Sequence, residues 1–186
     1  RQSMTRFNAQ NRVDATLISN LRIMRRTLIN QISKRCDKSK EIITGVVHAL
    51  LSRSIFIKYL EERKDSNGET VFPQDFYCNF MESAKRYTDV LNSKEATYNL
   101  FRILKDKFNG DTLQVSEIET EIITQDDLNE LRTFILGDSE LESRQLTLWP
   151  LYSFDIIPIQ LISSIYELFF HLSDEEDEKG TYYTPL

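Results

Sequence analysis

The residues of this sequence best suited to bind a ligand are Gly180 to Leu186, "GTYYTPL". Thr184 followed by Pro185 is typical of a helix start, because Thr caps the first turn and Pro suits its first position. The free N–H groups at a helix N-terminus attract a carboxylate or phosphate. Tyr182 and Tyr183 stand beside this start and can close over such an anion. The spacing therefore indicates an anion site, although a plain helix entry with core tyrosines is the simpler interpretation of spacing alone.

A second set of candidate residues is basic. Residues 1–64 carry 14 Lys and Arg against 5 Asp and Glu, whereas residues 65–186 carry 9 against 24, and the net charge is −6. A basic surface attracts the phosphates of DNA, and an acidic surface is repelled by them. We predict backbone contacts with DNA from Arg22, Arg25 and Arg26, on the face of a helix opposite its apolar stripe. The competing interpretation is an ordinary solvated helix face.

An acidic pattern at Asp75, Glu82 and Lys85 matches, in outline, the residues with which metal-dependent nucleases hold an ion and activate water. The surrounding stretch has a helical period, which places Asp75 and Glu82 two turns, about 10 Å, apart. Such a short pattern also recurs by chance, so we give the nuclease interpretation little weight. His48 and His171 each stand alone, so we expect both to be structural and predict no metal site.

The composition is that of a soluble globular protein, with 40% hydrophobic and 28% charged residues. No apolar run approaches the roughly 18 residues that span a bilayer, so we expect no membrane partner. The N-terminus lacks the apolar stretch of a secretory signal. Cys36 and Cys78 are isolated thiols, which fit a reducing compartment, and we therefore expect a cytoplasmic protein.

Hydrophobic periodicity predicts helices as the elements that position these residues. Apolar residues recur at gaps of three and four from Val13 to Ile32, which indicates one amphipathic helix. A second, more continuous apolar run covers 42–60 and predicts a central, buried helix. The polar stretch 64–70, "KDSNGET", indicates a turn. A third apolar stripe, over 76–91, predicts another helix.

Capping signals predict a fourth helix. Asn92 with Glu95 three residues later matches the capping box that opens a helix, and Gly110 stands where that helix would stop. The following residues, 111–120, have no clear period and leave room for a short strand.

The same signals recur further along the chain. Thr124 with Asp127 indicates the start of another helix, which Gly137 would close. Pro158 suits the first turn of a last helix over 158–169. The acidic run 173–180 indicates a solvated loop.

The segment 154–186 resembles the entry to the catalytic domain of adenine-N6 DNA methyltransferases of restriction–modification and phage-defence systems. That family has an F-x-x-I-P entry, an I-G-x-I-Y-E helix, a variable loop and then G-x-Y-Y-T-P. A serine, Ser163 or Ser164, replaces the usual glycine of the helix. The matching residues are Phe154, Ile157, Pro158, Ile165, Tyr166, Glu167, Gly180, Tyr182, Tyr183, Thr184 and Pro185.

Three upstream stretches are similar to the N-terminal helical region of large fused enzymes of this group. They are "LLSRSIFIKYLEER" at 50–63, "KDKFNGDTL" at 105–113 and "LTLWPLYSFDIIPI" at 146–159. The resemblance therefore covers most of residues 40–186.

The resemblance implies a full protein that binds S-adenosylmethionine and transfers its methyl group to N6 of an adenine flipped out of duplex DNA. Thr184, with backbone N–H groups of the helix it opens, would hold the methionine carboxylate; Tyr183 would pack near it, and Pro185 would fix the turn. The Gly-containing cofactor loop and the Asn/Asp-Pro-Pro-Tyr/Phe catalytic motif of the family do not occur in these 186 residues. We therefore expect a piece of a longer enzyme, with no catalytic residue of its own and no cofactor bound by the fragment alone.

Together these patterns predict an all-α domain of about six to seven helices over 1–150, with room for one short strand pair. Residues 151–186 would be a lead-in helix, an acidic loop and the start of a following α/β catalytic domain. The expected partners are double-stranded DNA and a nuclease domain or specificity subunit. The alternative, from another class of function, is a non-catalytic helical module that binds a protein partner or acts as a scaffold.

Overall fold

The computed structural model describes residues 2–108 and 113–137, and the surroundings of side chains from Thr16 onward. Within these ranges the protein is all-α, as predicted, with six α-helices and one short 3-10 helix. The only strand-type pairing in this part of the chain is a single antiparallel bridge between Lys64 and Thr70. The predicted helix at 158–169 and the predicted boundary at 150 lie outside the described residues.

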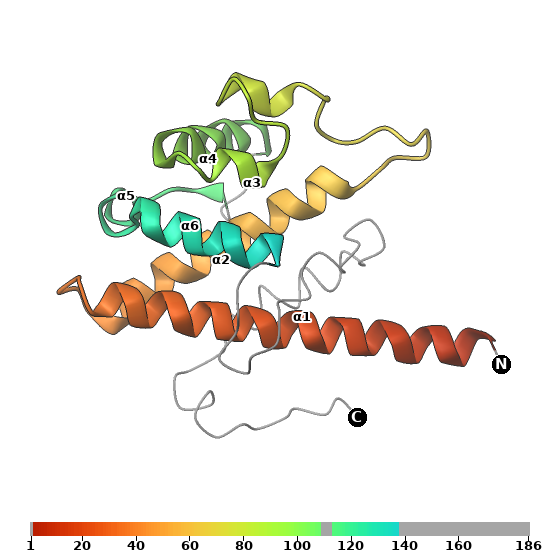
Figure 1. Cartoon of the computed structure of the whole chain (residues 1–186), viewed down its shortest axis with the longest axis horizontal. Helices are drawn as coiled ribbons and strands as arrows, with labels where there is room; N and C mark the ends of the chain where they lie inside the picture. Colours follow the sequence, from red (N-terminus) through yellow and green to blue (C-terminus); the bar gives the residue numbers. More distant parts are fainter. Residues whose placement is uncertain (1, 109–112, 138–186) are drawn as a thin grey trace.

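Two long helices, α1 (Gln2–Ser33) and α2 (Lys40–Glu62), pack against each other. Figure 1 shows α1 along one side of the molecule, α2 running obliquely across the middle and the shorter helices beyond it. Ser39 begins α2, and its side chain accepts a hydrogen bond from the backbone N–H of Ile42. The predicted stripe of α1 is buried at Leu17, Leu21, Met24, Leu28, Ile29 and Ile32.

The central, buried helix predicted from the run at 42–60 is confirmed in α2. All residues from Leu50 to Leu60 are buried except Phe56 and Lys58, which are partly buried. By length and composition α2 could cross a membrane, with a mean hydropathy of 1.3, so the expectation that no run approaches this length is corrected. A core helix of a globular fold passes the same test, and 67% of this window is buried inside the protein.

The turn predicted at 64–70 is confirmed. The Asp65 carboxylate accepts hydrogen bonds from the backbone N–H groups of Asn67 and Glu69, at 2.8 and 2.9 Å. The bond from Glu69 is the main reason that the pKa of Asp65 lies below its usual value, and the bond from Asn67 adds to it. Gly68 has a φ of 82°, a left-handed conformation that favours glycine.

The continuous helix predicted over 76–91 is wrong. The structure has the 3-10 helix η1 (Phe76–Asn79) and the four-residue α3 (Tyr87–Val90), with turns between them. Side chains give the backbone local partners here, because the Asn79 amide donates to the Phe76 carbonyl at 2.9 Å and Asp89 accepts from the Lys85 N–H at 3.0 Å. Such bonds compete with the helical ladder. Three aromatic side chains of the predicted stripe, Phe76, Tyr77 and Phe80, pack in a cluster with Phe72.

The fourth helix, α4 (Lys94–Phe108), is confirmed, but its cap is Ser93 and not Asn92. Ser93 Oγ accepts a hydrogen bond from the Ala96 N–H at 3.2 Å, whereas the Asn92 amide donates to the Asp89 carbonyl at 3.0 Å. Asn92 and Ser93 are neighbours and both are residue types that cap helices, so the prediction was wrong by one residue. The predicted end at Gly110 lies outside the described residues.

Two short helices complete the described chain, α5 (Glu117–Ile122) and α6 (Gln125–Leu136). No strand occurs over the described residues 113–120; α5 begins there instead, capped by Ser116, whose hydroxyl accepts from the Glu119 N–H at 3.2 Å. The capping box of Thr124 and Asp127 is confirmed at the start of α6. Gly137 ends α6 with a φ of 80°, as its position predicted.

Candidate functional site

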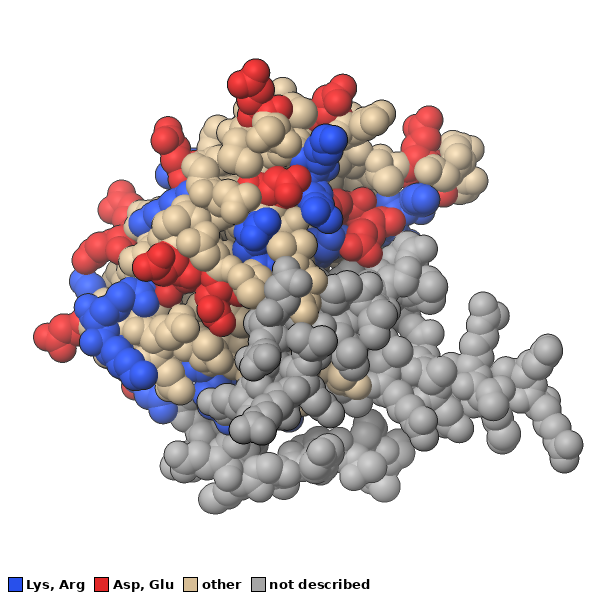
Figure 2. Space-filling view, in the orientation of Figure 1, with Lys and Arg blue, Asp and Glu red and all other residues tan. Residues whose placement is uncertain are grey.

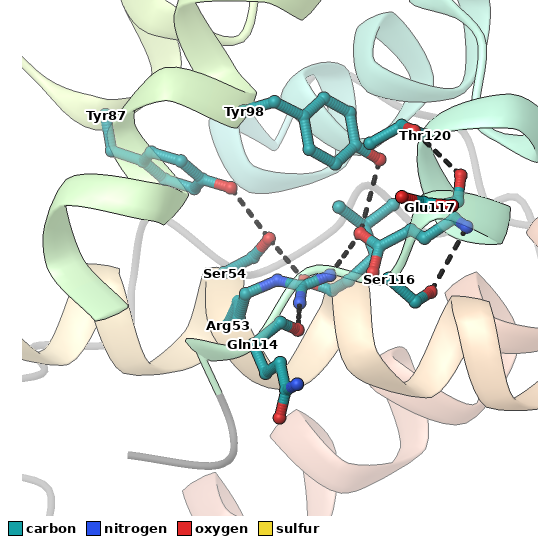
Figure 3. Close-up of polar contacts among 10 residues, drawn as sticks. Arg53, Ser54, Tyr87, Tyr98, Gln114, Ser116, Glu117 and Thr120 are labelled. Carbon is teal, nitrogen blue, oxygen red and sulfur yellow. Dashed lines mark hydrogen bonds and ion pairs between the residues drawn. The ribbon is translucent and has the colours of Figure 1, made fainter. Parts of the chain in front are cut away.

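The most completely buried ion pair of the described residues joins α2 and α5. Arg53 Nη2 donates to Glu119 Oε1, and the two side chains are 0% and 2% exposed. The other guanidinium end, Nη1, donates to the Gln114 carbonyl oxygen at 2.5 Å. Figure 3 shows Arg53 reaching from α2 toward the segment that carries Gln114 and Ser116. One arginine therefore holds both the entry to α5 and its buried carboxylate.

Two aromatic side chains of α4 surround this ion pair. The Arg53 guanidinium lies 4.8 Å from the centroid of the Phe101 ring, an arrangement that stabilises the cation. The Tyr98 hydroxyl donates to Glu119 Oε1 at 3.2 Å. Burial raises the pKa of Glu119, against the opposing effect of Arg53, and burial likewise raises the pKa of Tyr98. The pair thus connects α2, α4 and α5.

A second polar contact lies one residue along α2. Ser54 Oγ and the Tyr87 hydroxyl are 2.8 Å apart, and Ser54 Oγ also lies 2.8 Å from the Leu50 carbonyl oxygen. Because a carbonyl only accepts, the Ser54 proton points to Leu50 and the Tyr87 hydroxyl donates to Ser54. Burial raises the pKa of Tyr87, so this donor keeps its proton at neutral pH. The contact joins α3 to α2 (Figure 3).

This buried network is built to hold helices together rather than to carry out chemistry. Arg53, Glu119 and Tyr98 are each at most 3% exposed, so no substrate reaches them while the helices stay packed. Arg53 and Tyr98 both donate to the Glu119 carboxylate. A buried, hydrogen-bonded pair of this kind fixes the relative positions of its elements, since each group is costly to leave without its partner.

Two further charged clusters sit at the edges of the fold. Lys58 Nζ lies 2.5 Å from Glu61 and 2.8 Å from Glu62. Burial lowers the pKa of Lys58, but the charges of Glu61 and Glu62 and their hydrogen bonds outweigh it, so the pKa is raised. Glu61 also accepts from the Tyr87 N–H at 2.6 Å, which ties the start of α3 to the end of α2.

The other cluster joins the turn after α1 to α6. Arg35 donates to the Asp127 carboxylate and, at 3.2 Å, to the Ile122 carbonyl oxygen. Asp127 is the same residue that caps α6 by accepting from the Thr124 N–H at 2.7 Å. Arg35 is therefore engaged within the protein.

The three predicted DNA-contacting arginines do not share one exposed face. Arg26 is exposed and Arg22 is half-buried, but Arg25 is 2% exposed, and its Nε donates to His48 Nε2 of α2 at 2.6 Å. The placement of Arg25 on the outer face is thus corrected. The reason is helical spacing, because residue 25 follows Leu21 by four and so falls on the apolar stripe.

The other predicted site residues are placed as follows. Tyr183, Thr184 and Pro185 lie outside the described residues, as does His171. Asp75, Glu82 and Lys85 are all exposed, on the irregular segment around η1. No group of three or more His, Cys, Asp and Glu side chains able to hold a metal ion occurs in the described part of the chain.

Sequence reasoning missed the pair of Arg53 and Glu119. A signal for Arg53 was present, because it is the one charged residue within the apolar run 50–57. A charge in such a run requires a buried partner. Nothing local marks Glu119, which is one of several acids on α5 and becomes the partner only through packing.

No protein-family model, no curated protein and no solved structure matches this chain. Its function is therefore inferred from its own residues. The likeness to adenine-N6 methyltransferases stays a prediction that depends on the residues quoted for it.

Proposed function

We propose that this chain is the N-terminal helical portion of an S-adenosylmethionine-dependent adenine-N6 DNA methyltransferase of a restriction–modification or phage-defence system. The observation that carries the proposal is the order of residues in 154–185: an F-x-x-I-P entry, an apolar stretch that ends in Tyr-Glu, and G-x-Y-Y-T-P. Thr184 and Pro185 have the chemistry of a helix start able to hold the methionine carboxylate.

In this proposal the described helices support the reaction and do not carry it. The methyl transfer belongs to the cofactor loop and catalytic motif that follow in the family. Arg53, with Glu119 and Gln114, would keep α2, α4 and α5 in one arrangement as the protein engages duplex DNA. This division of labour agrees with a network whose charged groups are directed at one another.

The decisive experiment reads the coding sequence beyond Leu186. The proposal expects a Gly-containing loop within several tens of residues and an Asn- or Asp-Pro-Pro-Tyr/Phe motif further on. A reading frame that continues without either motif, or that stops at Leu186, would overturn it.

A binding measurement then tests the role of Thr184 in a chain extended through both motifs. Thr184→Val should weaken S-adenosylmethionine binding about ten- to a hundredfold, because a hydrogen bond to a charged group contributes about 1.5–3 kcal/mol. Thr133→Val is the matched control, since the Thr133 hydroxyl donates to the Asn129 carbonyl within α6. Equal cofactor affinity of the two variants in calorimetry would argue against the site.

A second candidate is a non-catalytic scaffold or protein-interaction module. The observation that favours it is that the structure engages several basic residues internally: Arg25 is buried beside His48, and Arg35 binds Asp127. This leaves fewer cations for DNA than the charge of 1–64 implies. Salt dependence separates the two functions, because phosphate binding weakens steeply with salt and an apolar interface does not.

A further inference from the structure

We propose that the outer face of the second half of α1, with the turn that follows it, binds the phosphate backbone of DNA through Arg26 and Lys34, with Arg22 and Lys38 flanking them. This inference rests on the proposed function, which supplies DNA as the partner. The set differs from the predicted one of Arg22, Arg25 and Arg26, because Arg25 is buried against α2 and cannot reach DNA.

Helical spacing places the chosen residues on one ridge. Arg26, Asn30 and Lys34 follow at steps of four, and all three are exposed. Each step of four rises about 6 Å in a helix, so Lys34, the first residue after α1, stands about 12 Å beyond Arg26 along the helix axis. One strand of DNA carries a phosphate about every 3.4 Å of its axis, so such a ridge runs past three or four phosphates.

The charge around this ridge favours an anion. Residues 15–36 contain no Asp or Glu. Within the described ranges no hydrogen bond or ion pair is recorded for Arg26 or Lys34, whereas Arg35 is held by Asp127. Figure 2 shows Lys and Arg side chains gathered at the lower left, over the end of α1 and its junction with α2. Two cations directed to solvent therefore remain for phosphate.

Lys38 extends the ridge past the end of α1. It lies 3.4 Å from Glu121, and the two side chains are 36% and 66% exposed. An exposed pair of this kind contributes little, so Lys38 can exchange its carboxylate for a phosphate. Glu121 therefore borders the ridge at Lys38, and we expect the duplex to follow the outer face of α1.

The test measures binding of the full chain to a fluorescein-labelled duplex of about 20 base pairs by anisotropy, from about 50 to 200 mM salt. The Arg26→Gln/Lys34→Gln variant should bind at least about tenfold more weakly at the lowest salt. Its plot of log affinity against log salt should be shallower by about 2, one unit for each phosphate contact. The control, Arg102→Gln/Lys105→Gln, removes the same charge from exposed positions of α4 and should match the wild type.

Equal affinities and equal salt slopes for the wild type and the Arg26→Gln/Lys34→Gln variant would overturn this inference, as would a wild type that binds no DNA at low salt. Far-ultraviolet circular dichroism of both variants checks that their helices are intact. The proposed function fails separately, on the coding sequence beyond Leu186. If the ridge binds DNA but no methyltransferase motifs follow Leu186, the ridge inference stands and the proposed function fails. If the motifs follow but the ridge does not bind DNA, the proposed function stands and the ridge inference fails.

Discussion

Arg53 is the residue whose environment departs furthest from its intrinsic preference. Its guanidinium lies in the core, where, among the described residues, Glu119, the Gln114 carbonyl and the Phe101 ring compensate its charge. The cost of desolvating such a pair roughly cancels its attraction, so the pair itself adds little net stability. Its importance is that neither partner tolerates the loss of the other.

Removing one member of the pair should therefore cost more than removing both. Arg53→Met leaves the Glu119 carboxylate buried without its counter-ion, and we expect a loss of about 3–5 kcal/mol in the free energy of unfolding. The double variant Arg53→Met/Glu119→Leu should be more stable than Arg53→Met alone. Urea unfolding followed by circular dichroism measures both. A double variant at least as unstable as the sum of the two single changes would contradict this account.

The raised pKa of Tyr87 predicts that the free energy of unfolding depends on pH. Its pKa is raised by burial, whereas in the unfolded chain it keeps a value near 10.0. The folded state therefore holds the proton that the unfolded chain releases, and this contribution is complete below pH 10 and is lost as the pH rises above it. Tyr87→Phe removes both the titration and the bond to Ser54.

The Tyr87→Phe variant should be about 1 kcal/mol less stable than the wild type near neutral pH. That deficit should shrink above pH 10, because only the wild type then loses the contribution of Tyr87. Urea unfolding at a series of pH values measures the difference in free energy of unfolding between the two proteins. Both proteins keep Tyr77 and Tyr98, so the titration of these residues cancels in the difference. A deficit that stayed constant across this range would show that Tyr87 ionises in the folded protein.

At the scale of the element, residue spacing predicted the helices with a clear period. The stripes of α1, α2, α4 and α6 were identified correctly, and Gly137 ends α6 where its position predicted. Periodicity failed over 76–91, where bonds from Asn79 and Asp89 to the backbone favour turns, and over 113–120, where Ser116 caps a six-residue helix too short to show a period.

The candidate site was predicted less well, for a physical reason. Arg26 was placed correctly on the outer face, but the placement of Arg25 was wrong, because residue 25 follows Leu21 by four and so falls on the apolar stripe. Arg53 and Glu119 are 66 residues apart in the sequence and pair only through tertiary packing. The residues at 180–185 lie outside the described part of the chain, so their role stays a prediction.

Replacing two glycines by alanine should change the stability in opposite directions, because one lies inside a helix and the other ends one. Gly45 lies within α2, where an added Cβ meets nothing within 4 Å, so Gly45→Ala should stabilise the protein by about 0.5–1 kcal/mol. Gly137 has a φ of 80°, so Gly137→Ala should destabilise it by about 1–2 kcal/mol. Thermal unfolding compares the two variants with the wild type. Shifts of the same sign would contradict the assigned backbone conformations.

At the scale of the whole molecule, α2 is the element around which the others assemble. It contacts α1, α3 and α5, and its buried side chains face in every direction around the helix axis. The shorter helices depend on it through Arg53, which binds Glu119 of α5, and through Ser54 and Glu61, which both bind Tyr87 of α3.

Hydrogen exchange should show that α2 is the most stable part of the fold. The backbone amides of 50–60 should exchange only when the protein unfolds as a whole, whereas those of the turn at 64–70 should exchange faster by many orders of magnitude. Mass spectrometry of peptides from the full chain measures both. Early exchange within 50–60 would show that α2 opens locally and is not the centre of the fold.

The same helix has a consequence for biosynthesis. The ribosome completes α2 at Glu62, but α6 ends only at Leu136, so at roughly 5–20 residues per second the apolar nascent helix waits several seconds for its later neighbours. During that interval α1 covers one side of α2. The apolar side chains on the other sides of α2 stay exposed to chaperones that bind nascent chains. We therefore expect chaperones at the ribosomal exit to engage this protein at α2 first.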